Sequence, residues 1–359
     1  MPAALQRNLP PLKRILQMPG AGNADGNSTN QRKNNMSTKS NLIELFTQRP
    51  GEYISGQSIA SQFAVSRNAV WKAVNALKRE GYTIESKHNC GYRFAQGSNL
   101  LTHSGILAHI HVPCDIEVFD TVTSTNSLAK EKNADFRAKV IIANRQSKGR
   151  GRLGRSFESP GGTGIYMSIA MKPRFALDRS LYVTMAAAVA VSRAIERVCD
   201  THIMIKWVND LFKEEKKICG ILTEAQTNFE TGRIDSLIVG IGVNCFPGDF
   251  SADVDAVAGC ISDIKGDFSR NVLAAEIINE SIRILENVDD KTFFDEYKRR
   301  CMILGKEITV NPNYDAEGFR AEAIDISEDG GLVVRILEGS YKGTTATLHT
   351  GEVSVAPLI

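Results

Sequence analysis

The apolar positions between residues 38 and 96 follow helical spacing three times and then alternate. Residues 42–45 suit a first helix, residues 56–63 suit a second, and a third begins at Ser66, a residue type that caps helix N-termini well. The third helix would bury one side through apolar residues at helical spacing: Val70, Ala73, Val74 and Leu77. Residues 82–94 alternate about a glycine turn, as a two-stranded wing would. The pattern therefore predicts an N-terminal winged helix-turn-helix.

The third helix presents polar and basic side chains opposite its apolar side. A recognition helix must offer such groups to a DNA major groove, and we predict DNA binding through the segment Gly56 to Asn75. The candidate contacts are Ser66, Arg67, Asn68, Lys72 and Asn75. A winged helix that binds protein is the alternative, and Trp71 is compatible with either packing or a DNA-facing surface.

Strand-like and helix-like patterns alternate from residue 97 to about residue 303. The predicted strands are Ile116–Phe119, Val140–Ala143, Gly164–Ala170, Ile203–Trp207, Ile218–Thr223 and Leu237–Val243. The predicted helices follow Thr125 and span Leu181–Val198 and Asn271–Leu285. This order predicts an α+β domain on a mixed sheet. Residues 304–359 hold four short β-patterns separated by Gly and Asp, which predicts a small barrel.

Composition sets limits on the class of protein. The 359 residues suffice for two or three domains, and residues 1–37, rich in Asn, Gly, Pro and basic residues, are expected to form a disordered tail. A formal net charge of +2 requires any DNA affinity to come from a local patch. Seven scattered cysteines without a C-x-x-C motif indicate reduced thiols, and no apolar stretch reaches the roughly 18 residues of a membrane span. We therefore expect a soluble, cytoplasmic protein without a membrane partner.

The most informative stretch is residues 144–155, which carry five basic side chains, three glycines and no acid. An apolar run at residues 140–143 precedes it and predicts a buried strand that leads into a cationic loop. Arginines and glycine N–H groups in such a loop can close over phosphates or another ligand that gains negative charge. A solvated surface or a polyanion-binding patch is the alternative.

Three further motifs accompany this loop. Short polar side chains at Thr123–Ser127 stand before a helical run, where they cap the helix or bind a small polar ligand. Ile205–Leu211 contains a lysine at a strand end, then a tryptophan, an amide and a carboxylate. Lys217–Leu222 and Val239–Asn244 add a lysine and glycines that permit close approach to a flat ligand. No dinucleotide fingerprint or P-loop is present.

These motifs, in this order and spacing, resemble those of the biotin protein ligases. They read S-T-N, G-R-G-R-x-G-R, K-W-x-N-D, K-x-x-G-I-L and G-x-G-x-N, and the last of them is Gly351–Ser354. With the N-terminal domain, the chain resembles the bifunctional class that is both biotin ligase and biotin-operon repressor, over about residues 40–359. The resemblance implies a class II synthetase-like ligase domain at residues 97–303 and an SH3-like barrel at residues 304–359.

The resemblance also implies roles for individual residues. The implied biotin-binding residues are Ser124, Thr125, Asn126, Gln146, Arg150, Gly151, Arg152 and Lys206. The implied ATP or adenylate residues are Arg152, Arg155, Asn209, Lys217 and Asn244, with Lys206, Arg150 and Arg152 as the catalytic groups. Val208 stands where the family usually has proline, and Phe157 where many members have tryptophan. Residues 246–259, which should help cover the adenine, align too poorly for an assignment.

The implied reaction joins biotin to ATP as biotinyl-5′-AMP, with Mg²⁺ assisting, and transfers biotin to a lysine of a biotin carboxyl carrier protein. The adenylate would act as corepressor for a homodimer on operator DNA. A biotin-responsive repressor without ligase activity, a ligase with a vestigial DNA-binding domain, and a lipoyl ligase of related fold are the alternatives. No protein metal ligand is assigned, because His109 and His111 have no third ligand nearby in the sequence.

Overall fold

A computed structural model describes residues 37–49, 51–79, 82, 84–95, 99–131, 138–172, 180–227, 234–311 and 318–355. The tail expected at residues 1–37 lies, apart from its last residue, outside the described residues. Among the helices that are described, none combines the length and apolar character that a membrane crossing requires.

The N-terminal part is a three-helix unit followed by a two-stranded antiparallel ribbon, as predicted. Its elements are α1 (Thr38–Gln48), α2 (Gly56–Phe63), α3 (Arg67–Arg79), β1 (Ile84–Lys87) and β2 (Gly91–Phe94). Ala64 ends α2 in the left-handed conformation with φ 53°. Ser66 Oγ accepts a hydrogen bond from the Ala69 N–H at 3.1 Å, which caps the start of α3. The predicted apolar face of α3 is confirmed, because Val70, Ala73, Val74 and Leu77 are all buried.

The central part is a seven-stranded mixed sheet. Its strands are β3 (Cys114–Val122), β4 (Ala138–Gln146), β5 (Gly164–Met171), β6 (Met204–Lys206), β7 (Asp210–Lys213), β8 (Lys216–Thr227) and β9 (Ile234–Asn244). The strand order is β3-β4-β5-β9-β8-β7-β6. The β3–β4 pair is parallel and every other neighbouring pair is antiparallel. The mixed sheet predicted from the sequence is confirmed, and β7 is a strand that the apolar pattern did not indicate.

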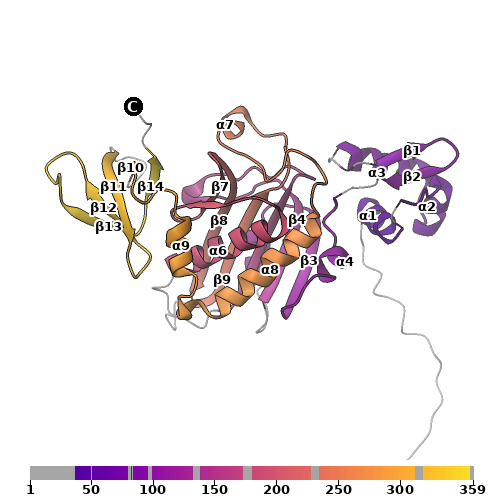
Figure 1. Ribbon diagram of the computed structural model, residues 1–359. Coiled ribbons are helices and arrows are strands. Elements are labelled where there is room, and N and C mark those ends of the chain that lie inside the picture. The colour runs from indigo at the N-terminus through magenta and orange to yellow at the C-terminus, as the bar shows by residue number, and fades with distance from the viewer. Residues whose placement is uncertain are drawn as a thin grey trace, which may run out of the picture. The chain divides into compact units, whose positions relative to one another are not determined.

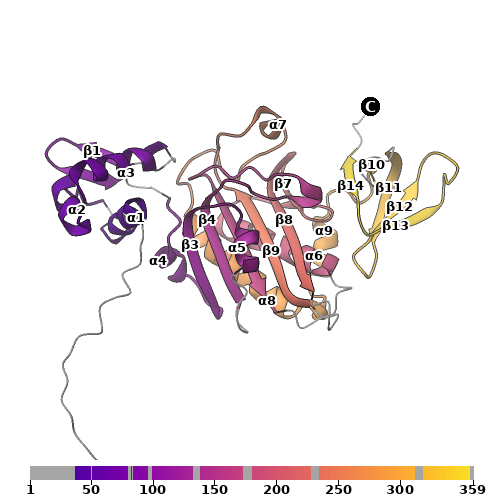
Figure 2. The same cartoon turned by 180° about the vertical axis from the view of Figure 1, so that it is seen from behind.

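Two long helices cover one face of this sheet and a short helix stands on the other. Helices α6 (Ser180–Val198) and α8 (Arg270–Glu286) pack against each other and against the sheet, and they are seen in front of it in Figure 1. The reverse view in Figure 2 shows α5 (Thr125–Glu131) on the opposite face, where Ala129 packs with Ile141, Ala170 and Ile238. Shorter helical segments are α4 (His103–Leu107), α7 (Ala252–Asp255), α9 (Phe294–Arg300), η1 (Arg152–Gly154) and η3 (Val288–Asp290).

The C-terminal part is a five-stranded antiparallel sheet. Its strands are β10 (Glu307–Asn311), β11 (Phe319–Ile326), β12 (Leu332–Ile336), β13 (Thr345–Leu348) and β14 (Glu352–Val355). The order β13-β12-β11-β10-β14 places the last strand beside the first. The four predicted strands are present, and the closing segment 352–355 adds a fifth.

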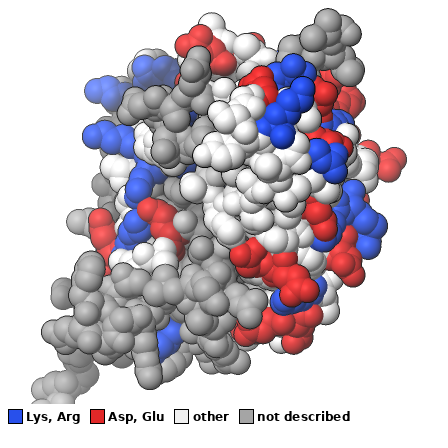
Figure 3. Space-filling model, turned by 90° about the vertical axis from the view of Figure 1, so that its left-hand side faces the viewer, with Lys and Arg blue, Asp and Glu red and all other residues white. Residues whose placement is uncertain are grey.

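On the face in Figure 3, described acidic and basic side chains are interspersed around a broad uncharged area, consistent with the near-zero net charge.

Candidate functional site

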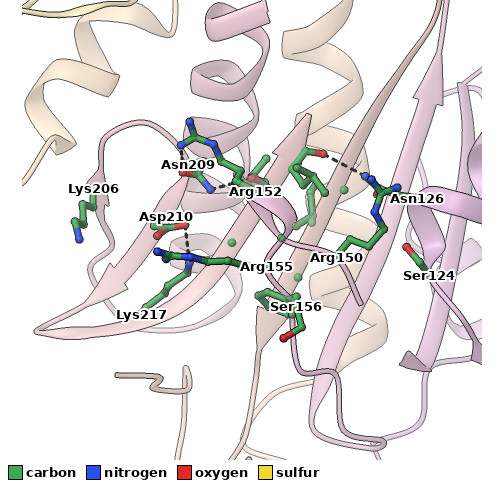
Figure 4. A pocket seen from close by; sticks show the side chains of 18 of the residues that line it. Ser124, Asn126, Arg150, Arg152, Arg155, Ser156, Lys206, Asn209, Asp210 and Lys217 are labelled. Carbon is green, nitrogen blue, oxygen red and sulfur yellow. Dashed lines mark hydrogen bonds and ion pairs between the residues drawn. The ribbon is translucent and has the colours of Figure 1, made fainter. Parts of the chain in front are cut away.

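A cavity of about 260 Å³ lies over the sheet face that carries α5. Residues from the cationic loop, the start of α5, the β6–β7 turn, and strands β8 and β9 line it. Figure 4 shows the polar side chains around the cavity. The predicted site residues among its lining are Ser124, Thr125, Asn126, Gln146, Arg150, Gly151, Arg152, Arg155, Lys206, Asn209 and Lys217. The three groups predicted to be catalytic, Arg150, Arg152 and Lys206, therefore share one cavity.

At one end of the cavity, Gln146 is held in a single amide orientation. Its Oε1 accepts hydrogen bonds from the Thr125 N–H at 2.8 Å and from Thr125 Oγ1 at 3.1 Å. Its Nε2 donates to Ser159 Oγ at 2.9 Å. These bonds tie the end of β4 to the first turn of α5, so polar groups of both segments face the same space.

Asn126 is held just as firmly, by two residues that the sequence analysis did not identify. Ser168 Oγ, fully buried on β5, lies 2.5 Å from Asn126 Oδ1 and 2.7 Å from Thr125 Oγ1. Asn126 Nδ2 donates to Glu224 Oε2 at 2.8 Å. Ser168 could have been identified as a serine inside an apolar strand. Glu224 could have been identified from its two-residue spacing along one strand, because this spacing places it on the same sheet face as Gly220 and Leu222.

The cationic loop is a hydrogen-bonded hairpin. Gly151 N donates to Arg155 O at 2.7 Å and Phe157 N donates to Gly149 O at 2.9 Å. The tip adopts left-handed conformations at Leu153 (φ 53°) and Gly154 (φ 77°). The hairpin directs Arg150 and Arg152 to different partners: Arg150 Nη2 lies 3.0 Å from Glu224 Oε1, and Arg152 Nη1 donates to Asn209 Oδ1 at 2.9 Å.

The β6–β7 turn supplies the opposite wall. Lys206, at the end of β6, lies with its Nζ 5.8 Å from the centre of the Phe212 ring. Lys217 Nζ forms an ion pair with Asp210 Oδ1 at 2.7 Å, and both residues line the cavity. The neighbouring Trp207 lines it too, although it is almost wholly buried, and its Nε1 donates to Gly330 O at 3.1 Å. The Trp207–Val208 peptide bond is cis.

The glycines of β9 make room for side chains of the site itself. A Cβ on Gly240 would lie 2.2 Å from Asn126 Oδ1, and a Cβ on Gly242 would lie 2.4 Å from the Phe157 ring. The sequence analysis attributed these glycines to close approach by a flat ligand. The structure shows that Asn126 and Phe157 occupy the space that side chains at these glycines would need.

Asn244 is the one predicted ligand residue that does not line the cavity. It is buried, and its Nδ2 donates to Gly259 O at 3.1 Å. Lys217 N donates to Val257 O at 3.1 Å, so the segment before Gly259 is also tied to β8. Asn244 therefore anchors part of residues 246–259, the segment left without an assigned residue. The C-terminal sheet contributes Asn311, Gly351, Val353 and Ser354 to the cavity wall.

A second candidate surface lies on α3. Arg67, Asn68 and Lys72 are exposed, and Asn75 is partly buried. The structure resolves the ambiguity of Trp71, whose side chain is 55% exposed beside Lys72 and Asn75. A large exposed aromatic ring among basic and amide groups is suited to contact with another macromolecule.

Comparisons with known proteins give the family. The chain is 36% identical over 330 residues to the bifunctional ligase/repressor BirA of Bacillus subtilis (strain 168), a match that spans 87% of this chain and 98% of that protein. The chain belongs to the bifunctional ligase/repressor family. This confirms the family predicted from the motifs. Family models agree in placement: a biotin/lipoate A/B protein ligase model matches residues 118–244 and a helix-turn-helix domain model matches residues 38–93.

The chain is also similar to more distant relatives over about two thirds of its length. The bifunctional ligase/repressor BirA of Escherichia coli (strain K12) is 25% identical over 238 residues, which cover 66% of this chain and 73% of that protein. The solved biotin protein ligase of Aquifex aeolicus in complex with biotin and ATP superposes with a TM-score of 0.56 at 27% identity. That comparison covers 67% of this chain and 98% of the Aquifex chain.

Proposed function

We propose that this ligase/repressor activates biotin with ATP and transfers it to a lysine of a biotin carboxyl carrier protein. The observation that carries the proposal is that Arg150, Arg152 and Lys206 line one cavity together with neutral hydrogen-bonding groups. A reaction that joins two anions needs such cations at the point of union. The bound biotin and ATP of the Aquifex relative support the same substrates.

The polar groups of the cavity divide into two sets. Ser124, Thr125, Asn126 and Gln146 offer uncharged donors and acceptors, which suit the ureido ring of biotin. Arg155, Asn209 and Lys217 lie on the side of the β6–β7 turn and suit the nucleotide, with Asn244 holding the segment that would cover the adenine. Gly151 and Arg152 belong to the loop between the two sets.

In the first step, a biotin carboxylate oxygen attacks the α-phosphorus of ATP, and the bond from that phosphorus to the bridging oxygen of pyrophosphate breaks. Lys206 binds the carboxylate and then the phosphate oxygens, so repulsion between the two anions is reduced as the new bond forms. Arg150 and Arg152 stabilise charge on the same oxygens from the loop. No side-chain nucleophile is required.

In the second step, the ε-amine of the carrier lysine attacks the carbonyl of biotinyl-5′-AMP, the amide forms and AMP leaves. This mixed anhydride would hydrolyse in water, so the loop from Gln146 to Phe157 must shield it. The hydrogen bond from Arg152 to Asn209 is the contact that holds the loop over the nucleotide side.

We propose that Mg²⁺ would be supplied with ATP and would screen the charge of the phosphates. Asp210 is the single carboxylate among the described residues that line the cavity, and Lys217 already neutralises it. Such a donor set fits a cation that keeps several waters and takes most of its ligands from substrate phosphates.

The test uses the full chain, ATP, biotin and a purified carrier domain, with lipoate in place of biotin in a parallel reaction. Mass spectrometry should find one biotinyl group on the carrier lysine in the complete mixture and none without ATP. Labelling by lipoate instead of biotin would favour the lipoyl ligase alternative. Absence of labelling, together with retained biotin binding, would favour a biotin-responsive repressor without ligase activity.

We further propose that the N-terminal domain binds operator DNA as part of a homodimer, with biotinyl-5′-AMP as corepressor. The exposed residues Arg67, Asn68 and Lys72 on α3 support this, since they can reach a major groove, and Ser66 caps the start of the helix. Gel shifts with and without biotin plus ATP test it. Retardation that depends on both substrates supports a repressor, and its absence supports a vestigial DNA-binding domain.

Four finer assignments belong with these proposals. An SH3-like barrel is consistent with the five antiparallel strands of residues 307–355, and a class II synthetase-like fold with the central sheet. Domain limits at residues 38–96, 97–303 and 304–359 follow the element order, and a cytoplasmic location agrees with the free cysteines of the described chain.

A further inference from the structure

Glu224 lies just outside the cavity, two residues beyond Leu222 on β8, and both of its carboxylate oxygens are occupied. Oε1 lies 2.7 Å from Lys130 Nζ and 3.0 Å from Arg150 Nη2. Oε2 accepts a hydrogen bond from Asn126 Nδ2 at 2.8 Å. One carboxylate thus contacts both α5, through Asn126 and Lys130, and the cationic loop, through Arg150.

The surroundings keep this carboxylate charged. Its side chain is 16% exposed, and burial by itself would raise its pKa. The hydrogen bonds from Lys130 and Asn126, and the charges of Lys130 and Arg150, outweigh burial, so the pKa of Glu224 is lowered. Two cations therefore share one partly buried anion, and its loss would leave Lys130 and Arg150 to repel each other.

Glu224 also fixes the direction of the Asn126 amide. Because Oε2 takes the Nδ2 donor, Asn126 Oδ1 points towards Ser168 Oγ, 2.5 Å away, and into the space that Gly240 leaves open. Reversal of the amide would place an oxygen against the carboxylate, which is unfavourable.

We propose that Glu224 is a positioning residue for adenylate formation and retention, which acts through Arg150 and Asn126 without touching the substrate. This inference rests on the proposed ligase function. It assigns two separable duties to one side chain: its charge holds Arg150 at the cavity wall, and its acceptor oxygen orients Asn126 for biotin.

Two substitutions separate the duties. Glu224→Gln removes the charge but keeps an acceptor for Asn126. Release of biotinyl-5′-AMP should therefore accelerate about tenfold, as expected for loss of a charge-assisted bond. The KM for biotin should stay close to that of the parent. Glu224→Ala removes both, and KM for biotin should rise as well. Glu117→Gln is the matched control, because Glu117 forms a 2.7 Å ion pair with Lys139 on β3 and β4 away from the cavity.

A double-mutant comparison tests the route through Arg150. With Arg150→Ala already present, Glu224→Gln should not accelerate adenylate release further. A merely structural role would accelerate adenylate release equally in both backgrounds. If thermal unfolding shows that Glu224→Gln does not fold, Glu224→Asp, which keeps the charge on a shorter side chain, should release the adenylate more slowly than Glu224→Ala.

The outcomes separate this inference from the proposed function. A parent chain that makes no biotinyl-5′-AMP from ATP and biotin would refute the ligase function itself. An active parent with Glu224→Gln releasing the adenylate at the parent rate, or with equal acceleration in both backgrounds, would overturn the positioning role alone.

Discussion

Arg152 Nη1 donates a hydrogen bond to Asn209 Oδ1 at 2.9 Å, which joins the cationic loop to a residue 57 positions away in the chain. Asn209 is itself fixed, because its Nδ2 donates to Ile221 O at 3.0 Å and its carbonyl accepts from Ile221 N at 3.0 Å. The loop arginine therefore binds to a rigid point on the sheet. The tip of the cationic loop, Leu153 and Gly154, is exposed, and this contact beside it can hold the loop in place over a ligand.

The first prediction concerns Arg152→Gly, which removes this contact. Biotin transfer should continue, but biotinyl-5′-AMP should escape roughly tenfold faster or more, because one hydrogen bond to a charged group is lost. Release of radiolabelled adenylate made in the site measures this. Lys148→Ala, at an exposed cation of the same loop outside the cavity lining, is the control. Equal retention by parent and Arg152→Gly would contradict the prediction.

The second prediction concerns the glycines of β9. Gly240→Ala should raise KM for biotin, since its Cβ would meet Asn126 Oδ1 at 2.2 Å and displace the amide. Gly242→Ala should weaken binding of the adenylate by displacing the Phe157 ring, which its Cβ would meet at 2.4 Å.

A second substitution tests the steric cause at Gly242. Phe157→Ala combined with Gly242→Ala should bind the adenylate better than Gly242→Ala alone, because the ring that clashes is gone. Titration of each variant with biotinyl-5′-AMP gives the comparison. If the double variant binds no better than Gly242→Ala, the glycine serves some purpose other than space for Phe157.

The third prediction concerns the exposed surface of α3 that carries Arg67 and Trp71. Arg67→Ala should weaken binding to duplex DNA and reduce the slope of affinity against salt by about one, as expected for one lost phosphate contact. Trp71→Ala should weaken binding with little change in thermal stability, because the ring is 55% exposed. Tyr341→Ala, at an aromatic residue that is 71% exposed in the turn between β12 and β13, should leave DNA affinity unchanged. Binding by Trp71→Ala equal to the parent would remove Trp71 from the interface.

The fourth prediction concerns the cysteines. Burial raises the pKa of Cys245 to about 12, so at pH 8 this thiol is protonated and unreactive in the folded chain. Iodoacetamide at pH 8 should modify the exposed Cys90 first and leave Cys245 intact until the chain unfolds. Peptide mapping by mass spectrometry follows both residues. Equal rates at the two cysteines in the folded state would show that Cys245 is accessible.

The sequence predicted those parts of the site that lie in compact motifs. Gln146, Arg150 and Arg152 belong to one short loop, and Lys206 ends a recognisable strand, so local motifs and the family resemblance together were enough to predict that they line one site. The cap at Ser66 and the buried face of α3 follow from helical spacing for the same reason.

The remaining features depend on contacts between distant segments. Asn126 and Glu224 are 98 positions apart, and the sequence contains no local sign that they meet. The space at Gly240 and Gly242 becomes meaningful once α5 and the cationic loop are placed against β9. Asn244 matched a motif, yet the fold directs its amide to Gly259 and away from the cavity lining.

The most direct test of the account is biotin-dependent exchange of pyrophosphate into ATP, which reports the first step without a carrier protein. The parent chain should exchange, and Lys206→Ala should be slower by about two orders of magnitude or more, as expected for one preorganised group that stabilises transition-state charge. Lys139→Ala, at a lysine paired with Glu117 away from the cavity, should exchange like the parent. Exchange by Lys206→Ala at the parent rate would contradict the claim that the cations of this cavity stabilise the charge that develops when biotin reacts with ATP.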